Sequence, residues 1–178
     1  MAAVLVLARG LSVGPMAALE AAPTGALYST LLMLHVVCAV VGFGAIGITG
    51  IQATRARRGP TAPGADGVRR YFRPGVNWIG RALYGVPVFG FCLLAASGGA
   101  FRAGDGFVVA GLLLWSTAAV AAESLVWPVE RRIQLVVWRH WEEAAPGALD
   151  RDCRLVAATA AVLAVVFVAA TVLMVGKP

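Results

Sequence analysis

The sequence has few charged residues for its length. Lysine, arginine, aspartate and glutamate make up 13% of its 178 residues, whereas a soluble globular domain has about 25%. The charges that are present cluster between long uncharged runs, which cover residues 27–51, 84–101 and 155–176. The mean hydropathy is +0.81. This pattern excludes an ordinary soluble domain, because a soluble surface needs charges spread along the whole chain.

Histidine and cysteine are also scarce, which limits the chemistry available. There are two histidines and three cysteines, and an odd number of cysteines does not form a complete disulfide framework. The motifs CxxC, HExxH and GxxxxGK[ST] are absent from the sequence, so the common signatures of zinc and nucleotide sites are missing. A hydrolase arrangement of serine, histidine and aspartate is missing too. We therefore expect a protein without catalytic activity.

Four apolar runs are long enough to cross a membrane. A helix of about 20 apolar residues spans the roughly 30 Å hydrocarbon layer, and the predicted spans are residues 27–51, 83–101, 107–128 and 155–176. The sequence therefore predicts an all-α fold, a four-helix transmembrane bundle that forms a single domain over residues 27–176. Residues 1–26 are expected to be a short N-terminal segment, with Met16 as an alternative start.

Basic residues predict the orientation of the spans. Seven arginines lie between the first and second spans, opposed only by Asp66, and five lie between the third and fourth. The other side holds only Arg9, Arg102 and Lys177. Short loops rich in lysine and arginine stay in the cytoplasm, so both termini are expected to lie outside.

The arginine-rich loop between the first two spans has an expected partner, the lipid bilayer. A basic residue near a membrane surface attracts anionic headgroups by about 1 kcal/mol. Residues 55–73, RARRGPTAPGADGVRRYFR, contain no folded module that recognises a nucleic acid. We therefore expect anionic headgroups, and no nucleic acid, at this loop.

After the third span, the helix is expected to continue past Pro128 as an amphipathic extension. One face of this extension would be apolar, and the polar residues would largely occupy the other faces. The expected apolar residues are Val129, Ile133, Val136 and Val137, and the expected polar residues are Glu130, Arg131, Gln134 and Glu142.

Residues 40–47, VVGFGAIG, have glycines in the GxGxxG spacing of a dinucleotide-binding loop. Such a loop belongs to alternating strands and helices, which the remaining apolar runs do not provide. Read along a helix in steps of three and four, Gly42, Ala45 and Thr49 share one face with His35. Small residues let membrane helices approach closely, so this face is interpreted as a helix-packing seam.

His35 is the only histidine inside a predicted span, and the seam directs it into the bundle. With a helical rise of about 1.5 Å per residue, His35, Cys92 and Ser116 lie about 12–13 Å from the outer ends of their spans. Cys38 lies about 5 Å deeper on the same rise. Imidazole and thiolate bind haem iron, copper and zinc, so His35 is a candidate cofactor ligand and His35, Cys38 and Cys92 are candidate metal ligands. Alternatively, His35 only hydrogen-bonds a neighbouring group.

Glu123 is the single acid inside a predicted span. It would lie about 24 Å from the outer end of that span, too deep to pair readily with His35. An acid within a membrane normally has a basic partner, and Arg81 enters the second span from the same edge. Glu123 and Arg81 are therefore expected to form an intramembrane ion pair, with a proton-relay role for Glu123 as the alternative.

Three segments carry a resemblance to a known family. These are LLMLHVVCAVVGFGAIGITG, YFRPGVNWIGRALYGVPVFGF and ESLVWPVERRIQ. The chain resembles the small bacterial integral-membrane proteins grouped as domain of unknown function 2269. It is more distantly similar to the copper-resistance D type proteins and to the HemJ-type protoporphyrinogen oxidases.

This resemblance implies a multi-pass protein of the bacterial inner (plasma) membrane, with an early "LHV" histidine in its first span, here His35. In the HemJ-like family a histidine of this kind is associated with haem, and the copper family is associated with copper entry. Haem or copper at His35 is the corresponding expectation.

Three functions are compatible with these residues. The first is a structural or accessory membrane subunit that packs through its small-residue seam, either with a membrane-protein partner or as a homo-oligomer. The second is a haem- or copper-binding membrane protein that uses His35. The third is a small proton-coupled transporter that uses Glu123.

Overall fold

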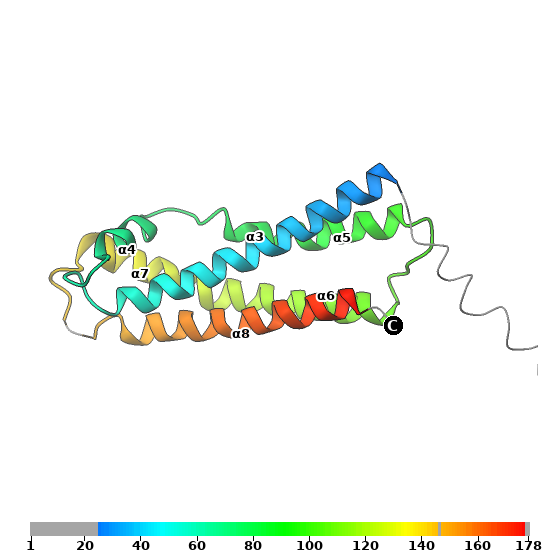
Figure 1. The fold of residues 1–178 in the computed structure, drawn as a ribbon. Helices are drawn as coiled ribbons and strands as arrows, with labels where there is room; N and C mark the ends of the chain where they lie inside the picture. The colour runs from blue at the N-terminus through cyan, green and yellow to red at the C-terminus, as the bar shows by residue number, and fades with distance from the viewer. Residues whose placement is uncertain (1–24, 146, 177–178) are drawn as a thin grey trace, which may run out of the picture.

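A computed structural model describes residues 25–145 and 147–176, and each regular element in these ranges is helical (Figure 1). Nearly all of the predicted N-terminal segment, with Met16, lies outside the described residues. Of the short elements, η1 is a 3₁₀ helix and η2 is a π-helical turn. In chain order, the elements are α3 (Ala26–Ala56), α4 (Ala65–Tyr71), η1 (Gly80–Tyr84), α5 (Gly85–Ala96), α6 (Gly106–Ala121), η2 (Ala122–Val126), α7 (Trp127–Arg139) and α8 (Asp150–Val175).

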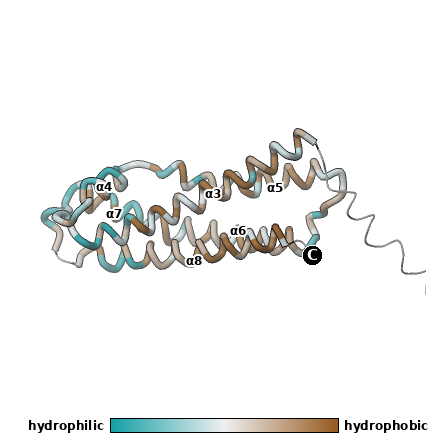
Figure 2. The backbone as a smooth tube through the Cα atoms, in the orientation of Figure 1, coloured by the Kyte–Doolittle hydropathy of each residue, from teal (hydrophilic) through white to brown (hydrophobic). Residues whose placement is uncertain are grey.

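Three helices are long and apolar enough to cross a membrane. They are α3, the continuous stretch Gly106–Arg139 that comprises α6, η2 and α7, and α8. Only 17% of the most apolar window of each is buried, so most residues in these windows are at least partly exposed. The colouring in Figure 2 shows the same division, with apolar helices along most of the molecule and polar segments around α4 and α7. The prediction of an all-helical fold is confirmed for the described residues. The three long apolar helices indicate a membrane-embedded protein.

The second apolar run forms a shorter helical segment, Gly80–Ala96. It begins before the predicted start of the span at residue 83 and ends before the predicted end at residue 101. The next glycines, Gly98 and Gly99, have φ values of 61° and 93°, a left-handed conformation that stops a helix and that glycine adopts without steric cost. Apolar composition therefore continues beyond the residue at which the helix ends.

The third apolar run continues through Pro128 into α7. A proline inside a helix clashes with the carbonyl group four residues earlier, which here belongs to Ser124 in η2. The wider turn of a π-helix changes the local geometry at this point, and the chain continues helically to Arg139.

Buried residues concentrate toward the arginine-rich end of the helices. On α3 they begin at Gly42, on α6 they begin at Ala118, and on α8 they end at Leu163. Helix α5 has no buried residue. The start of α3 and the end of α8 are both at the opposite end of the molecule (Figure 1). The packed core is therefore at one end, next to α4 and α7.

The predicted seam packs within the chain. Gly42, Ala45 and Thr49 are all buried. A Cβ atom on Gly42 would lie 2.6 Å from the backbone nitrogen of Leu83 in η1, and a Cβ atom on Gly50 would lie 2.6 Å from the Cβ atom of Ala160 in α8. These glycines therefore allow α3 to approach η1 and α8 closely.

The prediction of which α7 residues lie on polar faces is only partly correct. Glu130 and Gln134 are 4% and 6% exposed, although the sequence placed both on polar faces. Residues 73–79, which connect α4 to η1, cover this side of α7, and Asn77 bonds Glu130. The expected apolar face is mostly buried, with Val136 half-buried and three other residues fully enclosed: Val129, Ile133 and Val137.

Candidate functional site

Arg81 and Glu123 lie together, as the sequence predicted. Arg81 Nη1 donates to Glu123 Oε1 at 2.9 Å, and the Tyr84 hydroxyl donates to the same carboxylate oxygen. The Arg81 guanidinium also lies over the Trp127 ring, 3.6 Å from its centroid. Because Arg81 and Tyr84 belong to η1 whereas Glu123 belongs to η2, this cluster joins the second apolar segment to the third.

Both charged side chains of this pair are partly accessible, with 32% of Arg81 and 51% of Glu123 exposed. Polar contacts between membrane helices contribute about 0.6 kcal/mol on average and at most about 1.7 kcal/mol. The cation–π contact with Trp127 contributes separately, at roughly 0.5–2 kcal/mol. The aromatic residues at positions 84 and 127 are the part of this cluster that the sequence did not pair with Arg81.

Asn77 and Glu130 form a second polar contact, which the sequence analysis missed. Asn77 Nδ2 donates to Glu130 Oε1 at 3.3 Å, and the backbone nitrogen of Gly80 donates to Asn77 Oδ1 at 3.2 Å. One amide therefore holds both the start of η1 and the buried carboxyl group of α7. A signal was present: Glu130 follows Val126 by four residues and precedes Ile133 by three, which places it on the buried apolar face.

Thr49 connects the seam to α4. Thr49 Oγ1 donates to the carbonyl oxygen of Ala45 at 3.0 Å and lies 2.6 Å from the Tyr71 hydroxyl. Since the hydroxyl hydrogen of Thr49 is already used, Tyr71 donates to Thr49. Burial raises the pKa of the Tyr71 phenol, which keeps it protonated and able to donate. This bond fixes α4 against the end of α3.

His35 faces α5, near the end of the molecule with few buried residues. Its Nδ1 atom lies 2.8 Å from the carbonyl oxygen of Val86. A carbonyl oxygen only accepts, so Nδ1 carries the hydrogen and Nε2 keeps its lone pair. Gly90 lies beside the ring, since a Cβ atom there would be 3.4 Å from His35 Cε1. One turn further along α3, Cys38 Sγ lies against Gly85.

The three candidate metal ligands are not brought together. Cys92 is exposed, and it lies two residues after Gly90, which is about 200° around the α5 helix. It therefore points away from the face that contacts His35. Across the described residues, no group of three histidine, cysteine, aspartate or glutamate side chains could hold a metal ion. The predicted meeting of His35 with Cys92 is wrong because depth along a span does not determine the direction of a side chain.

Acidic residues after the third apolar run pair with arginines from the first loop. Arg57 Nε lies 3.1 Å from Asp150 Oδ1, and Arg69 Nη2 lies 3.0 Å from Glu142 Oε1. Acidic residues from elsewhere in the chain therefore balance more of the first loop's positive charge than the sequence of the loop alone indicates. Several arginines have no carboxylate partner among the residues that the structure describes: Arg55, Arg58, Arg70, Arg73, Arg131, Arg139 and Arg151.

Functional inference for this chain depends on these contacts. No match was found among models of protein families, curated proteins or solved structures.

Proposed function

We propose that this chain is a four-span protein of a bacterial inner membrane that acts as a structural or accessory subunit, without catalysis of its own. The observation that carries this proposal is the outward-facing apolar surface of the three long helices, whose apolar windows are 17% buried. In a membrane, lipid chains would cover that surface. We also propose, from the likeness of the three quoted segments, that the chain is related to the membrane proteins grouped as domain of unknown function 2269.

The shorter helical segment Gly80–Ala96 supplies the fourth span of this proposal. Its 3₁₀ part has 5 residues and its α-helical part has 12. With rises of about 2.0 and 1.5 Å per residue, the two parts extend for about 28 Å. This length is close to the roughly 30 Å of the hydrocarbon layer. The fourth span would complete a four-helix bundle.

The charge distribution supports an orientation with both termini outside. The unpaired arginines named above lie in or beside α4 and α7 and at the adjoining ends of α3 and α8, whereas the ends of the described chain lie at the opposite end of the molecule (Figure 1). Loops rich in basic residues stay in the cytoplasm. Anionic lipid headgroups at that surface are the proposed partners of the arginines.

Cysteine labelling tests the membrane topology. In a chain whose native cysteines are replaced by alanine, Ala62→Cys introduces a thiol between α3 and α4, and Ala103→Cys introduces one between α5 and α6. A membrane-impermeant maleimide should label position 103 in intact spheroplasts and position 62 only after lysis. The opposite result would contradict the orientation, and release of the protein by alkaline washing would contradict membrane insertion.

A subunit role also predicts a partner, either another membrane protein or a second copy. The seam from Gly42 to Thr49 packs inside the chain, so such a partner would contact the outward faces of the helices. Crosslinking in the native membrane, followed by mass spectrometry, should give discrete adducts. A chain that is monomeric and forms no adduct over a range of crosslinkers would contradict the subunit role.

The contact of His35 favours a second function, the binding of haem or copper. Metal-bound histidines commonly donate their other ring nitrogen to a backbone carbonyl or carboxylate, and the bond to Val86 provides this arrangement. If His35 is a ligand, the purified protein should contain stoichiometric iron or copper, and His35→Ala should lose it while the control Cys92→Ala retains it. A metal-free, colourless protein that was purified without chelators would contradict this function.

A transport role for Glu123 receives less support. A relay carboxylate must exchange protons, whereas Glu123 is held by Arg81 and Tyr84. These contacts favour a packing role for Glu123. A proton flux into proteoliposomes that disappears in Glu123→Gln would restore the transport hypothesis.

A further inference from the structure

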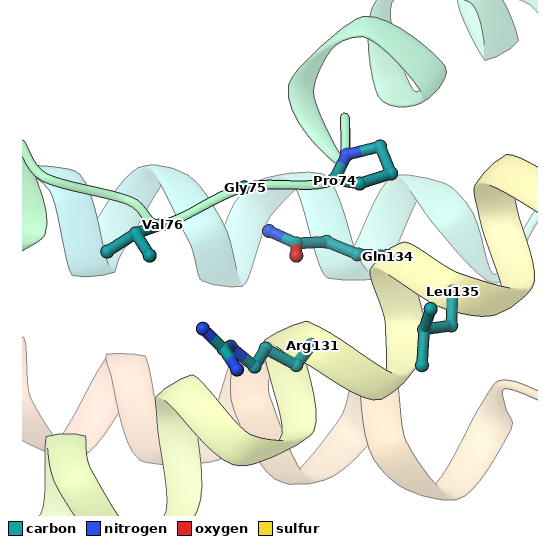
Figure 3. A pocket seen from close by; sticks show the side chains of 6 residues that line it. All are labelled: Pro74, Gly75, Val76, Arg131, Gln134 and Leu135. Atoms are coloured by element: carbon teal, nitrogen blue, oxygen red, sulfur yellow. The ribbon is translucent and has the colours of Figure 1, made fainter.

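A groove lies between α7 and the connection from α4 to η1. Its volume is about 250 Å³, and it is lined by Pro74, Gly75, Val76, Arg131, Gln134 and Leu135. Figure 3 shows the Arg131 and Gln134 side chains extending from α7 beneath the backbone of residues 74–76. Two side chains with N–H donors therefore reach one open space.

Gln134 is the most distinctive residue of this groove. The residue is 6% exposed as a whole, but its amide lines the groove and is not among the fully enclosed polar atoms of the described residues. The amide is therefore open to the groove, and no side chain or carbonyl group of the described residues bonds it. A ligand in the groove would give this amide the partner that the protein does not supply.

Arg131 adds a positive charge at the same place. It is exposed, and its guanidinium has no carboxylate partner among the described residues. By contrast, the adjacent Arg132 makes two bonds to Asp152, at 2.9 and 3.1 Å. A guanidinium beside an amide suits an anion with several acceptor oxygens, and phosphate is the common example.

The surroundings of the groove are apolar and exposed. Val76 and Leu135 within it are 41% and 51% exposed, and Trp78, Ile79 and Trp138 next to them along the chain are 76%, 65% and 47% exposed. Tryptophan is enriched where a protein meets lipid headgroups. A phosphate that carries acyl chains would use both the donors and these side chains, whereas a free phosphate would use only the donors.

We propose that this groove binds the headgroup of one anionic phospholipid, with Arg131 and Gln134 donating to its phosphate. The volume is slightly below the roughly 300–1,000 Å³ of pockets for drug-sized ligands, which suits a headgroup rather than a whole lipid. The acyl chains lie against the exposed apolar residues beside the groove. This assignment rests on the proposed membrane function, because it requires the arginine-rich end to lie at a lipid surface.

Native mass spectrometry of the full chain in detergent tests the assignment. The protein is titrated with phosphatidylglycerol and, separately, with phosphatidylcholine. Arg131→Ala should weaken phosphatidylglycerol binding by about tenfold or more, because a charge-assisted bond is lost. The matched control Arg151→Ala removes an unpaired exposed arginine outside the groove. It should weaken phosphatidylglycerol binding by no more than about fivefold, which corresponds to the roughly 1 kcal/mol attraction of one basic residue to anionic headgroups.

Gln134→Leu is the decisive variant, since it changes no charge and should still weaken phosphatidylglycerol binding by about fivefold or more. Circular dichroism confirms its folding, and Val76→Trp, which fills the groove from an exposed position, replaces it if folding fails. Equal binding of the two lipids, or unchanged binding in the groove variants, would overturn the assignment. Displacement of the lipid by equimolar glycerol phosphate would identify a soluble-anion site instead and would also overturn it.

A failure of the lipid-site assignment can be distinguished from a failure of the proposed membrane function. Binding in detergent does not depend on topology, whereas cysteine labelling does not depend on the groove. A correctly inserted protein without headgroup selectivity would refute only the lipid site. A protein extracted by alkaline washing would refute membrane insertion.

Discussion

Gly42 provides the sharpest test of how α3 packs. A Cβ atom at this position would lie 2.6 Å from the nitrogen and 2.8 Å from the Cα of Leu83, and backbone atoms yield less easily than the end of a side chain. Leu83 is also held from another side, because Trp115 Nε1 donates to its carbonyl oxygen at 2.9 Å. We therefore expect Gly42→Ala to lower the free energy of unfolding by about 1–3 kcal/mol, the usual cost of overpacking.

Gly44 and Gly47 on the same helix are matched controls. No atom lies within 4 Å of a Cβ atom built at either position, and alanine is favoured over glycine inside a helix by about 0.8–1.0 kcal/mol. Gly44→Ala and Gly47→Ala should therefore leave stability unchanged or raise it by up to about 1 kcal/mol. The same chemical change thus has opposite expected signs at positions two and five residues apart along the chain.

Thermal unfolding in detergent, followed by circular dichroism, measures this difference. For a protein of this size, 1 kcal/mol corresponds to about 2–4 °C in Tm. Gly42→Ala should melt several degrees below the wild type, and the two controls should melt at or above it. If all three variants melt alike, or if Gly44→Ala is the least stable, the close approach of α3 and η1 is wrong.

Three further predictions concern the polar contacts. A double-mutant cycle of Arg81→Ala and Glu123→Gln should give a coupling of about 0.6–1.7 kcal/mol, the range for polar contacts between membrane helices; a coupling above about 2 kcal/mol would contradict this expectation. Asn77→Ala should lower unfolding free energy by about 1–3 kcal/mol because it removes the bond to the buried Glu130, and unchanged denaturant unfolding would count against that bond. Tyr71→Phe should destabilise by about 0.5–1.5 kcal/mol through loss of the bond to Thr49, and an unchanged melting temperature would contradict it.

The sequence was sufficient for the helical class and for the helix-packing seam. Both depend on local information: uncharged runs indicate apolar helices, and small residues at steps of three and four indicate one face. The pairing of Arg81 with Glu123 could also be predicted from the sequence, because an acid inside a span needs a basic partner and Arg81 enters the neighbouring span at the same depth.

The failures share one cause, which is that tertiary contacts are not periodic. Glu130 and Gln134 read as polar-face residues until the segment 73–79 is known to cover that side of α7. His35 and Cys92 have similar expected depths, but the rotation of α5 separates them. Likewise, Arg57 and Asp150 are 93 residues apart in the chain, and nothing in either loop alone indicates that they meet.

The position of the core at one end has a consequence for sequence variation. On α3, no residue before Gly42 is buried, whereas buried residues recur from Gly42 to Ala56. Local opening is easiest where few buried contacts must break. Exchanges among valine, leucine and isoleucine should therefore accumulate freely in the first half of α3 and in α5, while the second half of α3 admits few. Evolutionary drift in this protein is expected to be fast at the end that holds the start of α3 and the end of α8, and slow near the arginines.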